Sequence, residues 1–218
     1  MKSILASIVC SVAVLLCSCG SSTGTTDIYR PYVDTTIAGY TVHVDKQLWD
    51  TQHGLTEHAL TTIERELGKA ISLLPSDAVT KIGSVPIWLE AKTPNGSPVQ
   101  YHFSADWLSE NGYHPKKEAS IEIVAKDYVK LAAANASLLS QLSAAYLQRV
   151  VGFTNQSVLA AFGNAVTLKR TRATNARDYF VFTSAVYFSE IQGNQALREL
   201  YKSEDSLSYE MLRSTWNL

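Results

Sequence analysis

Hydrophobic and polar positions follow two different periods along this chain, and the two periods predict two kinds of element. Between residues 56 and 74, apolar side chains recur every three or four positions, which predicts an amphipathic helix that ends at Pro75. Further helices are predicted over residues 131–151, 157–168, 178–191 and 205–216. Gly152 directly follows the first of these four helices and is placed to end it.

Short strands are predicted in the first half of the chain, over residues 39–44, 85–89, 99–103 and 121–124. Pro86 lies near the start of its strand, where a sheet tolerates proline. A turn at 94–97 precedes the third strand. Residues 106–115 are predicted to form an ordered loop in which Trp107 and Tyr113 are packing anchors. Because the strands precede most of the helices, the pattern predicts an α+β fold.

An apolar run over residues 4–16 stands apart from this pattern. It follows Lys2, has the length of a signal-peptide core and is too short to cross a bilayer stably as a helix. The residues that follow, LCSC at 16–19, resemble the bacterial lipobox, which implies that Cys19 is acylated with fatty chains such as palmitate and becomes the new N-terminus. Cys17 is the rival, but the bulky Leu16 stands where a small residue is needed. An ordinary secretory signal that is cut elsewhere is the alternative.

These features divide the chain into three parts. Residues 1–18 are predicted to be a lipoprotein signal peptide, residues 19–28 the lipidated cysteine with a polar tether, and residues 29–218 one folded domain. Several acyl chains on one cysteine hold a protein firmly at a membrane, so the expected location is the cell envelope. Gly20 replaces the aspartate associated with inner-membrane retention, which favours the outer membrane in a host that has two.

Composition excludes two classes of function for the mature domain. All three cysteines lie in the leader, so the domain has no disulfide and no cysteine metal site. The formal net charge is -1 and the sequence has no basic stripe, so it lacks the concentrated positive charge that nucleic-acid binding requires.

The order of short landmarks resembles the bacterial zincin-like metallopeptidases that are related to the catalytic domain of anthrax lethal factor. The landmarks are GYTV at 39–42, VPIWLE at 85–90, YH at 101–102, WLSENGY at 107–113, IEI at 121–123, AY at 145–146, VGF at 151–153, DYF at 178–180, YF at 187–188, LREL at 197–200 and Trp216. They cover nearly the whole mature domain. The resemblance implies a zincin-like fold, with a small N-terminal sheet and helix followed by a mostly helical second half.

That family is defined by His-Glu-X-X-His on a helix, where two histidines one turn apart bind zinc and the glutamate activates a zinc-bound water. In the matching stretch, Ser140 and Ala144 replace the histidines and Gln141 replaces the glutamate. Serine and alanine are not zinc ligands, and a glutamine amide is not a base near neutral pH. Asp178 matches the family's downstream acidic ligand, and Thr171 stands where a tyrosine is expected.

The departure predicts a pseudo-peptidase without zinc or another cofactor. Its residual groove would bind a peptide or an envelope protein, an expectation that rests on fold analogy. The alternative is an active metallopeptidase with a displaced site that uses His102, His114 and Asp178, or some other hydrolase. A serine hydrolase is disfavoured because Ser140 lies inside a predicted helix and not on a Gly-X-Ser-X-Gly turn. Hydrogen-bonded loop histidines and an aromatic core around Asp178 are the structural alternatives.

Overall fold

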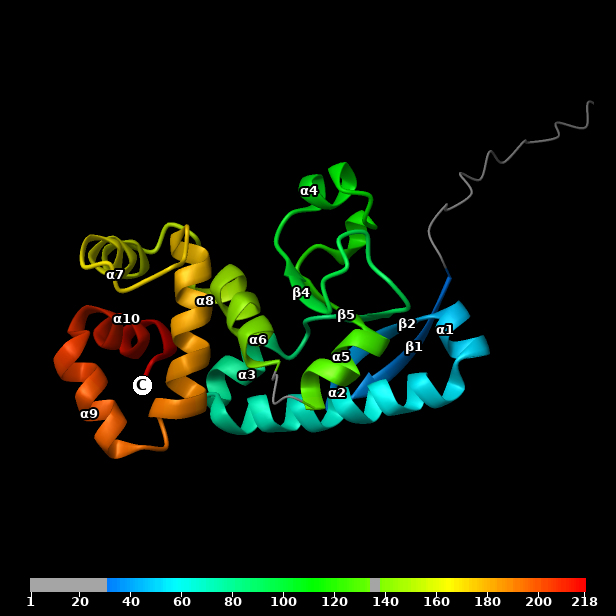
Figure 1. Ribbon diagram of the computed structural model, residues 1–218, viewed down its shortest axis with the longest axis horizontal. Coiled ribbons are helices and arrows are strands. Elements are labelled where there is room, and N and C mark those ends of the chain that lie inside the picture. The colour runs from blue at the N-terminus through cyan, green and yellow to red at the C-terminus, as the bar shows by residue number, and fades with distance from the viewer. Residues whose placement is uncertain (1–30, 134–137) are drawn as a thin grey trace, which may run out of the picture.

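The computed structural model describes residues 31–133 and 138–218, so the predicted signal peptide, Cys19 and the tether lie outside the described residues. Figure 1 shows a sheet with its helices on one side of the molecule and a group of helices on the other. The strands are β1 (Tyr32–Ile37), β2 (Tyr40–Asp45), β3 (Ile87–Glu90), β4 (Val99–His102) and β5 (Ser120–Val124). The predicted α+β class is confirmed, and β2 to β5 match the four predicted strands to within two residues at each end.

The five strands form one mixed sheet in the order β1-β2-β3-β5-β4. The three central strands β2, β3 and β5 run parallel, and the two edge strands β1 and β4 are antiparallel to their neighbours. Parallel strands are buried on both faces in most proteins, and every residue of β3 and β5 is buried here. β4 is therefore an edge strand beside a fully covered centre.

The two faces of the sheet differ in chemistry because side chains alternate along each strand. One face is apolar, and its buried residues include Val42, Val44, Ile87, Leu89, Ile121 and Ile123. This face shares the hydrophobic core with α2 (His53–Leu73) and α5 (Ala125–Ala133). The strand register aligns His43, Trp88, Glu122 and Gln100 across the other face. The second face is therefore polar, although much of it is also buried.

Short helical segments connect the strands. They are α1 (Lys46–Thr51), α3 (Ser76–Ile82), α4 (Ala105–Glu110) and the 3-10 turn η1 (Pro115–Lys117). The predicted loop over 106–115 is wrong in part, because Ser104 caps a helix by accepting a hydrogen bond from the backbone N–H of Trp107 at 3.3 Å. Tyr113 is buried as predicted, whereas Trp107 is 44% exposed.

The rest of the chain is helical. It consists of α6 (Leu139–Tyr146) with the π-helical turn η2 (Leu147–Val151), α7 (Gln156–Thr167), α8 (Ala176–Val186) with the π-helical turn η3 (Tyr187–Ile191), α9 (Gln195–Glu204) and α10 (Ser206–Trp216). The prediction of one helix over 131–151 is wrong at its start, since α5 begins at Ala125 and a separate helix begins at Leu139. Gly152 ends η2 with a φ of 81°, as its position predicted.

Trp216 lies at the centre of the helical half. Its indole stacks on the ring of Tyr146 with centroids 4.0 Å apart and contacts the ring of Phe188 at 4.8 Å. Its Nε1 donates a hydrogen bond to Ser184 Oγ at 3.0 Å, so the one polar atom of this buried side chain is satisfied. The C-terminus thereby fixes α6 against α8, and this pair of helices forms one side of the cleft described next.

Candidate functional site

A cleft of about 610 Å³ lies between the edge strand β4 and the helices α6 and α8. Residues 100–104 of β4 and its extension form one wall, and Trp107 of α4 forms the rim beside them. The opposite wall consists of Gln141 and Ala144 of α6 and of Arg177, Asp178 and Val181 of α8. The cleft therefore joins segments that are up to about eighty positions apart in the sequence.

Three of the four positions that match the metal-site residues of the resembling family lie in this cleft. Gln141, Ala144 and Asp178 line it together, while Ser140 does not line it and accepts a hydrogen bond from Gln141 Nε2 at 3.3 Å. Residues three apart share one face of a helix, which is why Gln141 and Ala144 both point toward α8. Positions of α6 and of the first turn of α8 therefore line one cleft.

The carboxylate of Asp178 is engaged by its own neighbours. It accepts hydrogen bonds from Arg177 Nε at 3.0 Å and from Asn175 Nδ2 at 2.8 Å. Asn175 also caps α8 by accepting from the backbone N–H of Asp178 at 2.9 Å. Asp178 therefore stabilises the first turn of α8, where a negative charge is favourable, and the carboxylate that it presents to the cleft is paired with Arg177.

The alternative metal site is not assembled by the residues that the structure describes. His102 and Asp178 line the cleft, but His114 does not, and its Nδ1 accepts a hydrogen bond from the backbone N–H of Lys116 at 3.1 Å. Within 31–133 and 138–218, no group of three or more His, Cys, Asp or Glu side chains is placed to hold a metal ion. The predicted loss of zinc stays a prediction.

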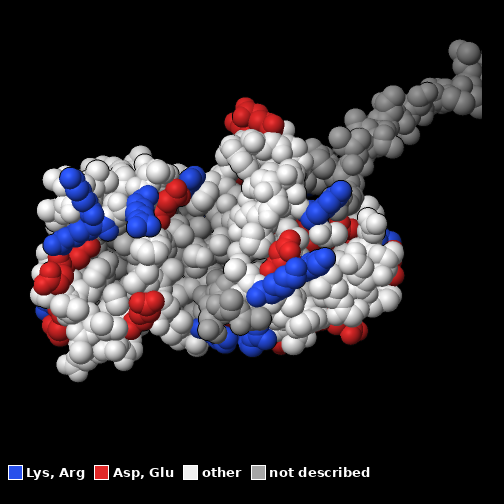
Figure 2. All heavy atoms as spheres, viewed as in Figure 1, with Lys and Arg blue, Asp and Glu red and all other residues white. Residues whose placement is uncertain are grey.

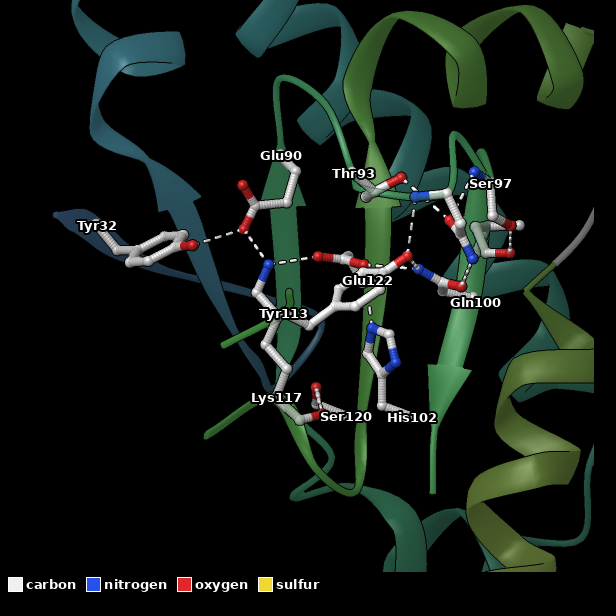
Figure 3. Close-up of polar contacts among 12 residues, drawn as sticks. Tyr32, Glu90, Thr93, Ser97, Gln100, His102, Tyr113, Lys117, Ser120 and Glu122 are labelled. Carbon is white, nitrogen blue, oxygen red and sulfur yellow. Dashed lines mark hydrogen bonds and ion pairs between the residues drawn. The ribbon is translucent and has the colours of Figure 1, made fainter. Parts of the chain in front are cut away.

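Behind the β4 wall, the polar face of the sheet carries a buried charged network (Figure 3). Lys117 Nζ lies 2.6 Å from Glu90 Oε1 and also contacts Glu122 Oε1. His102 Nε2 lies 3.0 Å from Glu122 Oε2, which also accepts a hydrogen bond from Gln100 Nε2 at 2.8 Å. All four charged or titratable side chains of this network are at least about nine-tenths buried. Buried charges are tolerated only when they are paired in this way.

Hydrogen bonding keeps Glu122 ionised. Burial acts to raise the pKa of its carboxyl, but the hydrogen bond from His102, the charge and hydrogen bond of Lys117 and the hydrogen bond from Gln100 outweigh burial and lower the pKa below its ordinary value. An ionised carboxylate has acceptors only, so the His102 Nε2 atom carries the proton of their shared hydrogen bond. The network therefore fixes the orientation of an imidazole that lines the cleft.

Aromatic rings form the rim of the cleft. The rings of Trp107 and Tyr113 lie 5.5 Å apart, and the ring of Tyr113 lies 5.1 Å from the imidazole of His102. On the other side, the guanidinium of Arg177 lies over the ring of Phe103 at 4.6 Å, within the range of a cation–π contact. Trp107 and Phe103 thus line the cleft, with Arg177 over the ring of Phe103 and Tyr113 buried behind Trp107.

One edge of the β4 backbone is hydrogen-bonded to β5, and the other edge lies on the side of the cleft. Pro98 O accepts from Val124 N at 2.9 Å and His102 O accepts from Ala119 N at 2.8 Å, so the even-numbered residues direct their backbone groups toward β5. In an antiparallel pair these directions alternate, which turns the backbone groups of Val99, Tyr101 and Phe103 toward the opposite edge. Phe103 O there accepts from Gln148 Nε2 at 3.2 Å.

Most of the network leaves no signal in the sequence, because its members come from separate segments. Glu90, Lys117 and Glu122 were not candidates, and no local motif joins them. One signal was present: Glu122 stands between two isoleucines in a predicted strand, and a central strand buries both faces. A carboxylate at such a position requires a buried partner.

Comparison with protein-family models, with curated proteins and with solved structures finds no match to this chain. Among the described residues, no helix combines the length and the apolar character that crossing a membrane requires.

Proposed function

We propose that this chain is a lipid-anchored protein of the cell envelope whose zincin-like domain binds an extended peptide segment in the cleft without hydrolysing it. One observation carries the proposal. The cleft is bounded by an edge strand on one side and, on the other, by α6 positions that carry Gln141 and Ala144 in place of a base and a ligand. An edge strand binds extended peptides through main-chain hydrogen bonds, while the neighbouring pockets select the side chains.

Several properties of the cleft support a binding role. Its volume lies within the range of ordinary ligand sites, and its wall combines aromatic rings with a few polar groups. The buried network holds His102 in place from behind, so the β4 wall is pre-organised before a ligand arrives. A pre-organised wall lowers the entropy cost of binding.

The competing proposal is an enzyme with a rebuilt site, and the pairing of His102 with Glu122 favours it. A carboxylate that orients an imidazole at a cleft wall is the arrangement that general-base catalysis uses. An enzyme would cleave casein or another protein substrate, and His102→Gln would abolish the cleavage. A binding protein would leave the substrate intact.

The binding proposal is tested with a cleft-filling variant. Gln141→Trp places a large ring in the cleft at a half-buried position, and Lys126→Trp adds the same ring at an exposed position of α5. A fluorescein-labelled mixture of random hexapeptides should bind to the wild type and to Lys126→Trp but not to Gln141→Trp in equilibrium dialysis. Equal binding to all three proteins would contradict the proposal.

The anchor is tested separately. Cells that express the full chain should incorporate a palmitate analogue into the protein, and Cys19→Ala should abolish the label while Cys17→Ala retains it. Zinc content on the purified domain tests the loss of the metal, because about one tightly bound zinc per chain would contradict it.

A further inference from the structure

A second cavity adjoins the cleft at Asp178, which lines both. It encloses about 540 Å³ and is lined by Arg170, Thr171, Arg172, Ala173, Asp178 and Phe182. All but the last two residues come from the connection between α7 and α8. Phe182 is 65% exposed, so an aromatic ring stands open to solvent at this cavity. We call it the arginine pocket.

The arginine pocket has more positive than negative charge available to a ligand. Arg170 donates to the backbone oxygen of Glu204, which fixes its side chain and leaves other N–H groups of the guanidinium for a ligand. Arg172 is exposed and forms no hydrogen bond, ion pair or ring contact with any residue in the described ranges. Among the residues that the structure describes, Asp178 alone contributes a carboxylate to the pocket lining, and this carboxylate already accepts hydrogen bonds from Arg177 and Asn175.

Further basic side chains lie near the pocket. Figure 2 shows Lys and Arg side chains, with Asp and Glu side chains among them, over the part of the molecule that carries α7 and the start of α8. Lys169, Arg170 and Arg172 of the connecting segment and Arg177 of α8 lie within nine residues of sequence. An anionic group is therefore attracted to the same end of the cleft at which the apolar ring of Phe182 is exposed.

We propose that the arginine pocket binds the C-terminal residue of the peptide that occupies the cleft, so that the protein recognises a free chain end. This inference rests on the proposed function. The α-carboxylate binds to Arg172 with support from Arg170, and an apolar side chain on the same residue packs against Phe182 and Ala173. A guanidinium matches a carboxylate through two parallel hydrogen bonds.

A chain end fits this pocket better than an internal acidic residue does. In a C-terminal residue, the carboxylate and the apolar side chain are attached to the same Cα, so both parts of the pocket are filled at once. An internal aspartate or glutamate offers the carboxylate but leaves the exposed ring of Phe182 uncovered. The preceding residues would extend into the cleft at about 3.3 Å each, alongside β4.

The test compares two forms of one peptide mixture. The probe is a fluorescein-labelled hexapeptide mixture that is randomised at five positions and ends in leucine, prepared with a free carboxylate and with a C-terminal amide. The proteins are the wild type, Arg172→Gln and Lys126→Gln, an exposed control on α5 that removes the same charge. Equilibrium dialysis measures the bound fraction.

The wild type should bind the free acid about tenfold or more tightly than the amide, which corresponds to one charged hydrogen-bonded contact. Arg172→Gln should abolish this preference, and Lys126→Gln should retain it. Equal binding of acid and amide by the wild type would overturn the inference, and so would a preference that survives Arg172→Gln.

Two further outcomes separate this inference from the proposed function. If both forms bind equally and Gln141→Trp blocks both, the peptide cleft stands and chain-end recognition falls. If neither form binds at millimolar concentration, both proposals fall together. Sedimentation with phosphatidylglycerol vesicles that depends on Arg172 would also overturn chain-end recognition, because the pocket would then serve a lipid surface.

Discussion

The imidazole of His102 and the carboxylate of Glu122 are joined by a hydrogen bond of 3.0 Å across the β4–β5 pair, and both side chains are almost completely buried. His102 also lines the cleft, whereas Glu122 belongs to the network behind it. This bond therefore connects the wall of the candidate site to the charged interior of the sheet. A change in the network is expected to affect the cleft.

Replacing Glu122 tests the network. Glu122→Gln should lower the free energy of unfolding at neutral pH by about 3 kcal/mol, because the buried Lys117 loses one of its two carboxylate partners and keeps Glu90, while His102 is left with a neutral partner. Glu110→Gln, an exposed change of the same kind, should have little effect. Urea unfolding measures both, and equal stability of the two variants would contradict the assignment.

The same variant has a predictable pH dependence. The pKa of Glu122 is lowered in the folded protein, so its contribution to stability is present above the ordinary value of 4.5 and is lost as the pH falls through the folded-state pKa. The wild type should lose stability more steeply than Glu122→Gln below about pH 4.5. Parallel curves of unfolding free energy against pH for the two proteins would show that the pKa of Glu122 is not lowered by folding.

Restoring the family's metal residues tests the register of α6. The variant Ser140→His, Gln141→Glu, Ala144→His should acquire zinc, because its two new histidines are four positions apart on α6 and Asp178, which lines the same cleft as Ala144, supplies a third ligand. The measurement is zinc stoichiometry on purified protein, with Asp178→Asn added to the triple variant as the control. Absence of zinc from the triple variant would mean that the assumed geometry is wrong.

Two tyrosines give opposite predictions for stability. The hydroxyl of Tyr128 is buried and has no hydrogen-bond partner among the described residues, and burial raises its pKa. Tyr146 instead donates to Thr215 O at 2.9 Å. Tyr128→Phe should therefore leave the free energy of unfolding unchanged or raise it, and Tyr146→Phe should lower it by about 1 kcal/mol. Thermal unfolding measures both variants. A larger loss of stability in Tyr128→Phe than in Tyr146→Phe would contradict these hydrogen-bond assignments.

Trp107 is expected to act in binding more than in folding. Its ring is 44% exposed at the rim of the cleft, so Trp107→Ala should change the free energy of unfolding by less than about 1 kcal/mol. The affinity for the hexapeptide mixture should fall about tenfold, as for an exposed aromatic contact residue. Leu207→Ala, on a similarly exposed residue of α10, should leave the affinity unchanged. If both changes lower the peptide affinity equally, Trp107 is not part of the binding site.

The sequence predicted elements where one period persisted for several residues. The apolar repeat of residues 56–74 became α2, and the helix predicted at 157–168 became α7. Among the described elements, β1, α1, α3 and α9 were missed, and α4 was predicted as a loop. β1 is an edge strand of mixed burial, so it lacks the sharp alternation of apolar and polar positions that predicts a strand. α9 is ten residues long, and its apolar positions Leu197, Leu200 and Tyr201 span little more than one helical turn.

The candidate site was predictable only where a resemblance supplied the register. Gln141, Ala144 and Asp178 were singled out in this way, and they line the cleft together. Glu90 and Lys117 were not, because the contact between them joins positions that are 27 residues apart and depends on the pairing of β3 with β5. A long-range charge pair leaves no pattern in a short window of sequence.

The position of Lys117 has a consequence for the order in which the protein assembles. Its ammonium group reaches Glu90 and Glu122 from the turn that precedes β5, at the end of the long connection that contains α4. Two carboxylates resist removal from water until a cation accompanies them. We therefore expect the apolar side of the sheet to collapse first during folding, and the side with the charges to become dry only after the α4 connection has docked.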